Sequence, residues 1–135
     1  MTQELQSGHS DPRAAAAVVL DAQALERLRE LDPDGRHGVL MRVLGAFETS
    51  LAQALVQWAA QREAGDAAGV AGLAHAFKSS AASVGALSLA AACAEIERRQ
   101  RAAPAGEPAV LGQDVQRLIA EGEAALAAVR AMLAP

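Results

Sequence analysis

The stretch Gly72–Arg99, GLAHAFKSSAASVGALSLAAACAEIERR, is dominated by alanine and carries one histidine and one lysine among small side chains. Alanine and leucine have the highest helix propensities, and Gly85 interrupts the run at a point where a helix can end. The stretch therefore predicts two consecutive helices, one ending near Gly85 and the next running to about Arg101. Helix packing alone does not explain His75 and Lys78.

The rest of the chain predicts further helices, because its apolar residues recur at steps of three and four. Asp21 and Asp66 are good N-cap residues, and Pro108 suits the first turn of a helix. The expected helices are a short one from about 21, ending before the DPDG turn at 32–35, and then 36–63, 66–85, 86–101 and one after a linker at 102–108. The expected buried stripes are Leu25, Leu28 and Leu31; Leu40, Leu44, Phe47, Leu51, Ala54 and Trp58; Leu89, Cys93 and Ile96; and Leu111, Val115, Leu118, Gly122, Leu126, Val129 and Leu133.

These helices predict an all-α fold, since no alternating apolar and polar run indicates a strand. Short connections favour antiparallel neighbours. We therefore expect an up-down-up-down four-helix bundle, with the additional short N-terminal helix capping one end. Residues 1–19 are polar at their start and are expected to form a flexible tail, and residues 20–135 are long enough for one domain with its own core.

Charge and composition limit the classes of function. A net charge of −4 and a pI near 5.3 argue against a general nucleic-acid binder. The segment 73–101 has a net charge of +2, from four basic and two acidic residues, so the remainder carries −6. This mildly basic zone would suit an acidic partner, although a solvated helix face explains it equally well.

The sequence favours a cytoplasmic protein with no membrane partner. No uninterrupted apolar run approaches the roughly 18 residues needed to span a bilayer, and Ala14–Leu20 lacks the basic leader of a signal peptide. Cys93 is the single cysteine, so an internal disulfide is impossible. We expect Cys93 to be a small buried hydrophobe rather than a reactive thiol.

His75 is expected on the solvent side of its helix. At about 100° per residue, Leu73, Phe77 and Val84 lie opposite it and form the predicted buried stripe. Residues three, four and seven positions away share its face, and all of them except Lys78 are small. These neighbours are Ala71, Gly72, Lys78, Ser79 and Ala82. Small residues on an outer face favour a docking surface, because another protein's backbone can approach closely.

The pairing of His75 with Lys78 suggests phosphoryl chemistry. Imidazole is largely neutral, and therefore nucleophilic, near physiological pH. A phosphoryl group on His75 would lie one helical turn from the Lys78 ammonium, a suitable point charge for it. A histidine and a lysine three residues apart also occur by chance, so an ordinary exposed histidine remains an alternative at this point.

The sequence resembles the histidine phosphotransfer (HPt) domain family of multistep phosphorelays. The family's pattern is roughly A-H-x-L-K-G-S-(S/A)-x-x-x-G-A-x-x-L, followed by a small residue or Cys and then L-E. This chain reads AHAFKSSAASVGALSLAAACAEIE from Ala74 to Glu97. It matches at His75, Lys78, Ser80, Gly85, Ala86, Leu89, Cys93 and Glu97, with Phe77 and Ile96 as apolar replacements. The segment LDAQALERLREL at 20–31 also looks like the family's lead-in.

The resemblance implies a phosphocarrier with a four-helix bundle and an extra N-terminal helix. By this resemblance His75 would accept a phosphoryl group from a receiver domain's phospho-aspartate and pass it to another receiver. Lys78 would stabilise the phosphoryl group. Ser79 stands where the family usually has glycine; it would allow close approach and is able to donate a hydrogen bond. Gly85 is given a structural role, either ending a helix or allowing close packing.

The implied partners are receiver domains of response regulators and a hybrid sensor histidine kinase. The chain has no cofactor of its own under this interpretation, and the Mg²⁺ would belong to the partner receiver. No nucleotide-binding loop of the P-loop or kinase type is present in the sequence, so phosphorylation from ATP would need a separate kinase.

The sequence can also be compared with two other functions, a helical adaptor and a metal-binding bundle. A helical adaptor would bind a receiver through the same small-residue surface without accepting phosphate. A metal-binding bundle would need Glu-x-x-His motifs, but Gln6, Asp34 and Gly72 precede the three histidines at that spacing. The metal-binding alternative is therefore disfavoured.

Overall fold

A computed structural model describes residues 19–102 and 107–135 of the chain. These residues form helices and no strand, which confirms the predicted all-α class. The helices are α3 (Ala22–Glu30), α4 (Val39–Ala64), α5 (Ala67–Ser83), α6 (Leu87–Ala102) and α7 (Pro108–Leu133). The predicted N-caps Asp21 and Asp66 both accept a backbone hydrogen bond, from Ala24 and Gly69 respectively.

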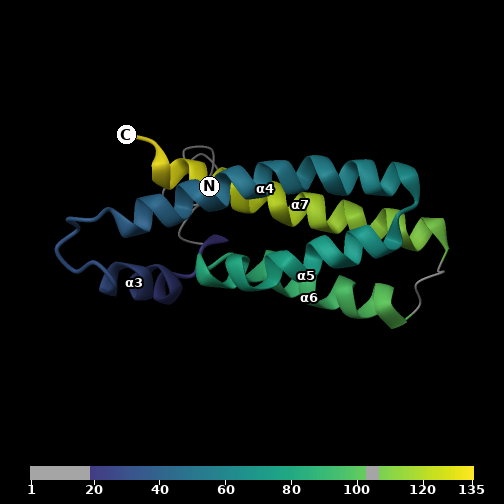
Figure 1. The fold of residues 1–135 in the computed structure, drawn as a ribbon, viewed down its shortest axis with the longest axis horizontal. Coiled ribbons are helices and arrows are strands. Elements are labelled where there is room, and N and C mark those ends of the chain that lie inside the picture. The colour runs from purple at the N-terminus through teal and green to yellow at the C-terminus, as the bar shows by residue number, and fades with distance from the viewer. Residues whose placement is uncertain (1–18, 103–106) are drawn as a thin grey trace, which may run out of the picture.

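Helices α4 to α7 form a bundle in which consecutive helices run in opposite directions (Figure 1). Contacts between α4 and α5, α5 and α6, α6 and α7, and α7 and α4 place them in chain order around the bundle axis. Helix α3 contacts α4 and α5 and lies at one end of the bundle (Figure 1). Because α5 and α7 are diagonal to each other, a side chain on the outer face of α5 lies far from α7.

The turn before α4 delays the start of that helix from the predicted residue 36 to Val39. The buried Asp32 carboxylate accepts hydrogen bonds from the backbone N–H groups of His37 and Val39. Burial opposes the charge of Asp32, but these backbone donors hold its pKa below the usual value. His37 therefore lies in the turn before the helix, and its side chain is exposed.

Leu31 was expected on a buried side but is 69% exposed, because α3 ends at Glu30 and the chain turns outward.

All three aromatic residues of the chain meet between α4 and α5. The ring of Phe77 lies 5.8 Å from that of Trp58 and 6.1 Å from that of Phe47, at tilted angles. Tilted aromatic pairs contribute about 0.5–1.5 kcal/mol beyond the burial of their surface. This cluster fixes the buried side of α5 only two residues from His75.

Helix α4 is long and apolar enough, by length and composition alone, to cross a membrane; an 18-residue window within it has a mean hydropathy of 1.4. Its predicted stripe nevertheless faces the bundle core, since Leu44, Phe47, Leu51, Ala54 and Trp58 are buried there. Leu40 of the same stripe is only partly buried. Helix α4 therefore forms one wall of the bundle and lines its core with this stripe.

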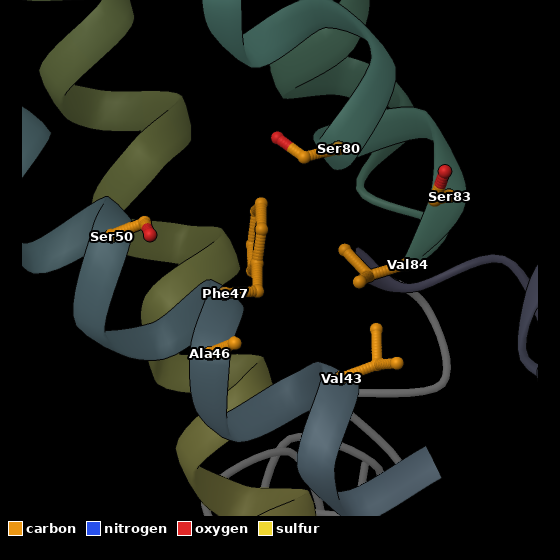
Figure 2. A pocket seen from close by; sticks show the side chains of 7 residues that line it. All are labelled: Val43, Ala46, Phe47, Ser50, Ser80, Ser83 and Val84. Carbon is orange, nitrogen blue, oxygen red and sulfur yellow. The ribbon is translucent and has the colours of Figure 1, made fainter. Parts of the chain in front are cut away.

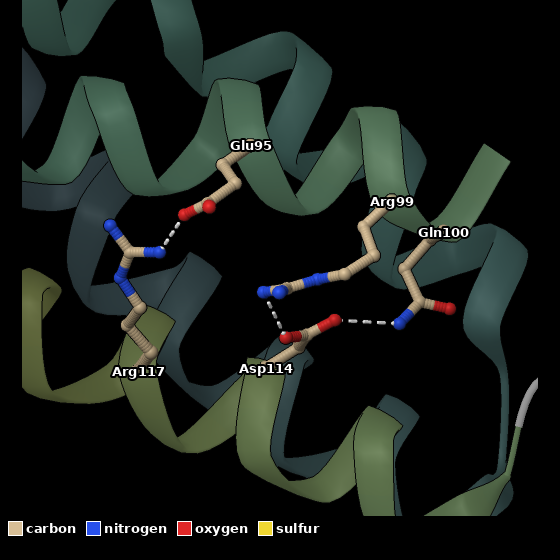
Figure 3. Close-up of polar contacts among 5 residues, drawn as sticks. All are labelled: Glu95, Arg99, Gln100, Asp114 and Arg117. Atoms are coloured by element: carbon tan, nitrogen blue, oxygen red, sulfur yellow. Dashed lines mark hydrogen bonds and ion pairs between the residues drawn. The ribbon is translucent and has the colours of Figure 1, made fainter. Parts of the chain in front are cut away.

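Polar side chains fasten α6 to α7 (Figure 3). The buried Asp114 of α7 accepts hydrogen bonds from Arg99 at 2.7 Å and Gln100 at 2.8 Å, so both of its carboxylate oxygens are used. Arg117 of α7 pairs with Glu95 of α6. These contacts fix the register of α6 along α7.

Gly85 ends α5 and also contacts the segment before α3. It has a φ of +84°, in the region that favours glycine, and its carbonyl accepts a hydrogen bond of 2.8 Å from the Asp21 N–H. Leu20, which precedes Asp21 in the chain, is fully buried, and Val19 packs against the core. Gly85 therefore ends the helix, as one of the two expected roles requires, and its close contact is with the backbone before α3. The rest of the predicted tail, residues 1–18, lies outside the described residues.

We predict that Gly85→Ala destabilises the protein by about 1–3 kcal/mol, because a side chain there is strained at positive φ. The added Cβ would also lie 2.6 Å from the Asp21 nitrogen. Urea unfolding measures the loss. The matched control is Gly72→Ala on the open face of α5, where nothing lies within 4 Å; it should be neutral or gain about 0.5–1 kcal/mol. Equal stability of the two variants would contradict this account of the turn.

Candidate functional site

The buried side of α5 is rotated toward α6 relative to the prediction. Its buried residues are Val70, Ala71, Ala74, Phe77 and Ala81, whereas Leu73 is only partly buried. The reason is that α5 packs most extensively against α6, and small alanine side chains allow this approach. His75 therefore lies beside the buried side rather than directly opposite it.

Ala71 was predicted to belong to the docking surface, and this prediction is wrong. Ala71 is 5% exposed, because it lies on the flank of α5 that α6 covers. The other small neighbours of His75 lie in the open: Gly72, Ser79 and Ala82 are exposed, and Lys78 is partly exposed. The small-residue surface around His75 thus extends over the side of α5 away from α6.

His75 is exposed, as expected, but one of its ring nitrogens is held. Its side chain is 58% exposed, and Nδ1 lies 2.8 Å from Oε2 of Glu97 on α6. An ionised carboxylate can only accept hydrogen bonds. The Nδ1 atom must therefore carry the proton, and the neutral ring keeps its free lone pair on Nε2.

Glu97 is the centre of this polar cluster. Its side chain is only 7% exposed, and its other oxygen, Oε1, lies 2.6 Å from Lys78 Nζ. Arg101, one turn further along α6, approaches Oε2 at 3.0 Å. The hydrogen bond from Lys78, together with His75 and Arg101, holds the pKa of Glu97 below its usual value despite burial. Glu97 is therefore a carboxylate at neutral pH.

Sequence reasoning missed the role of Glu97. Glu97 is part of the family pattern, but the pattern alone assigns it no function. The signal was an acidic residue on the mostly apolar inner face of α6, next to Ile96 and four residues after Cys93. A buried charge of this kind needs partners, and the nearest helix offered His75 and Lys78.

Cys93 lies buried beneath the cluster. Burial and the nearby charge of Glu97 raise the pKa of its thiol to about 12, while Lys78 acts in the opposite direction. A thiol that is protonated at neutral pH is a poor nucleophile. Cys93 thus packs as a small hydrophobe, as predicted. Among residues 19–102 and 107–135 no cluster of three or more His, Cys, Asp or Glu side chains could hold a metal ion.

An open apolar groove runs between α4 and α5, next to the small-residue surface. Figure 2 shows the ring of Phe47 extending from α4 toward Ser80 of α5, with Ser83 and Val84 closing one side. Val43, Ala46 and Ser50 complete the lining. The groove does not include His75, but Ser80 and Ser83 directly follow Ser79 and Ala82 in the chain.

Comparison with known proteins identifies the family of the fold. A family model described as the Hpt domain matches residues 42–132, more than half of the chain. The matched range contains most of α4 and all of α5 and α6, and ends in α7; α3 lies before it. Neither a curated protein nor a solved structure matches the chain.

We predict that Glu97 contributes to stability at neutral pH and loses this contribution in acid. A carboxyl group whose pKa is lower in the folded state stabilises the fold above its unfolded pKa, and the contribution disappears as the pH falls through the folded pKa. The free energy of unfolding should therefore decrease from about pH 5 to pH 3, and less steeply in Glu97→Gln. The control, Glu63→Gln at the exposed end of α4, should keep the wild-type slope. Identical slopes in all three proteins would contradict the account.

Proposed function

The chain belongs to the Hpt domain family, and on this premise we propose that it is a phosphocarrier that accepts a phosphoryl group on His75. Members of the family carry out histidine phosphotransfer in phosphorelays. The observation that supports His75 as the acceptor is its hydrogen bond to Glu97, which leaves a free lone pair on Nε2 of a 58% exposed side chain.

In the proposed transfer, Nε2 of His75 attacks the phosphorus of a receiver's phospho-aspartate. A bond forms between Nε2 and phosphorus, and the bond between phosphorus and the aspartate oxygen breaks, with its electron pair remaining on the carboxylate. The proton on Nδ1 stays between His75 and Glu97. The product ring is a phosphorylated imidazolium whose positive charge faces the Glu97 carboxylate, and this charge makes the neutral imidazole a good leaving group for the next transfer.

Lys78 and Ser79 are proposed to assist this step. Lys78 lies one helical turn from His75, and its long side chain allows the ammonium to neutralise the charge that builds up on the phosphoryl group. Ser79 is exposed one turn after His75 and leaves room for the partner. It is also able to donate a hydrogen bond to the phosphoryl oxygens.

The proposed partners are receiver domains, which would supply the aspartate and bind the Mg²⁺, with a hybrid sensor histidine kinase as the source of phosphate. Receiver binding is a property of the family; the individual receivers are part of the proposal. Gly72, Ser79 and Ala82 are the proposed contact residues beside His75, and Ala71 no longer belongs to this set because it is buried. We also propose that the protein acts in the cytoplasm, where receiver domains are found.

The test of the acceptor is a transfer assay from a ³²P-labelled receiver domain. Wild type and His37→Gln should take up label, whereas His75→Gln should take up none. Glu97→Gln should be labelled about tenfold more slowly, because the ring is no longer held in one orientation and tautomer. Failure of every candidate receiver to label the wild type, or labelling of His75→Gln at the wild-type level, would refute the proposal.

The same assay separates the carrier from the adaptor. An adaptor would bind a receiver with measurable affinity but take up no label, and His75→Ala would leave its affinity unchanged. A carrier takes up label that is stable in alkali and labile in acid, as expected of phosphohistidine. Calorimetry of receiver binding, run beside the labelling assay, gives both measurements on the same proteins.

We predict that bulk on the small-residue surface blocks the partner. Ala82→Trp places a large ring on the His75 side of α5 and should slow transfer from a receiver at least about tenfold, because the two backbones are kept apart. The matched control is Ala127→Trp, an exposed alanine on the diagonal helix α7, which should transfer at the wild-type rate. Equal rates for the two variants would show that the receiver docks elsewhere.

A further inference from the structure

We propose that Arg101 is the counter-ion that allows Lys78 to leave Glu97 and bind the phosphoryl group. This inference rests on the proposed function of His75 and adds a positioning residue to it. Neither the sequence pattern nor the family match assigns a role to Arg101, which was counted only as one of the basic residues of α6.

Lys78 is not free in the unphosphorylated protein. Its Nζ atom lies 2.6 Å from Oε1 of Glu97, a short charge-assisted contact. To neutralise a phosphoryl group on Nε2 of His75, the ammonium must break or share this contact. The transfer therefore includes a change of partner by Lys78, and what remains around Glu97 determines how unfavourable that change is.

Glu97 needs a positive charge at all times. Its side chain is 7% exposed, and a buried carboxylate without a cation is strongly unfavourable. When Lys78 leaves, the contacts that remain are those on Oε2, from His75 Nδ1 at 2.8 Å and Arg101 at 3.0 Å. Arg101 is the one permanently charged group of the two. Among the contacts of the described residues, Arg101 is thus the cation that can replace Lys78 before the transfer gives the ring its own positive charge.

The arrangement of the two oxygens suits such an exchange. Lys78 contacts Oε1, whereas His75 and Arg101 contact Oε2. The departure of Lys78 therefore leaves both contacts on Oε2 in place. The Arg101 side chain is 60% exposed, and it extends from the same helix as Glu97, four residues further along. It therefore stays in place when the partner docks on α5. With a neutral ring and both cations present, the four side chains carry a charge of +1. Phosphorylation makes the ring an imidazolium and adds about two negative charges, so the charge of the cluster falls to about zero, whereas without Arg101 it would fall to about −1.

The test uses chemical phosphorylation, so that it does not depend on any receiver. Phosphoramidate donates a phosphoryl group to imidazole: Nε2 attacks phosphorus and ammonia leaves with the electron pair of the P–N bond. The protein carries His9→Gln and His37→Gln, which leave His75 as its single histidine. The labelling rate of His75 and the ¹⁵N signal of the Lys78 ammonium are followed by NMR.

Arg101→Gln should slow the labelling of His75 about threefold, a change consistent with the loss of one partly exposed ion pair. Arg101→Lys should restore the rate, since it keeps the charge. The matched control is Arg98→Gln, an exposed arginine of the same helix with no ion pair to Glu97, which should label like the parent. The Lys78 signal should move on phosphorylation in the parent protein and move less in Arg101→Gln.

A double variant distinguishes exchange from direct binding. If Arg101 acts by keeping a cation on Glu97 while Lys78 leaves, Arg101→Gln has no further effect in a Glu97→Gln background, where no carboxylate holds Lys78 or needs a cation. Additive effects would mean that Arg101 contacts the phosphoryl group itself and would overturn the exchange. A parental rate for Arg101→Gln, or a Lys78 signal that does not move on phosphorylation, would overturn it as well.

Failure of the inference and failure of the proposed function give different results. A protein that no receiver labels, but whose chemical phosphorylation depends on Arg101 as described, would refute the phosphocarrier while keeping the exchange. A protein that receivers label at the same rate with and without Arg101, and whose Lys78 signal stays fixed, would refute the exchange alone.

Discussion

The close approach of α5 to α6 is the constraint on which the site depends. Ala71, Ala74 and Ala81 on α5 are all buried, and no larger side chain could stand there without moving α6 away. At this short separation a glutamate rooted on α6 reaches Nδ1 of His75 at 2.8 Å and Nζ of Lys78 at 2.6 Å. The alanine-rich composition is therefore part of the chemistry: it sets the distance between the imidazole and the carboxylate that orients it.

The rest of the bundle holds these two helices at fixed positions. On the side of α6 that faces α7, Asp114 binds Arg99 and Arg117 binds Glu95 (Figure 3). These two residues of α6 follow and precede Glu97 in the chain. On the far side of α5, the aromatic ring of Phe77 is packed against two aromatic rings of α4. The Gly85 turn joins the two helices directly and is closed by the backbone of Asp21. A shift of α5 along α6 would have to break one of these three attachments.

Helix positions could be predicted from the sequence because they depend on local rules. The spacing of apolar residues, the caps at Asp21 and Asp66 and the glycine at 85 placed the helices to within a few residues of their observed ends. The orientation of α5 was predicted less accurately. A helical wheel that considers only large apolar residues gives no weight to alanine, although alanines form much of the buried side of α5. Ala71 was consequently placed outside, although contact with α6 buries it. The role of Glu97 depends on a contact between residues 22 positions apart, which no local pattern contains.

The exposure of the ring explains why such a site would act as a carrier rather than as an enzyme. A His75 side chain that is 58% exposed lies largely in water, where the attraction between a phosphoryl group and a nearby cation is weak. Docking of a partner on the small residues of α5 would exclude that water, and the same charges would then act in a medium of lower dielectric constant. Glu97 is only 7% exposed in the free protein, and its cations hold it as a carboxylate there. Its role therefore does not depend on the exclusion of water by a partner. The orientation of the ring is thus built into the bundle, while the electrostatic contribution to transfer develops only in the complex.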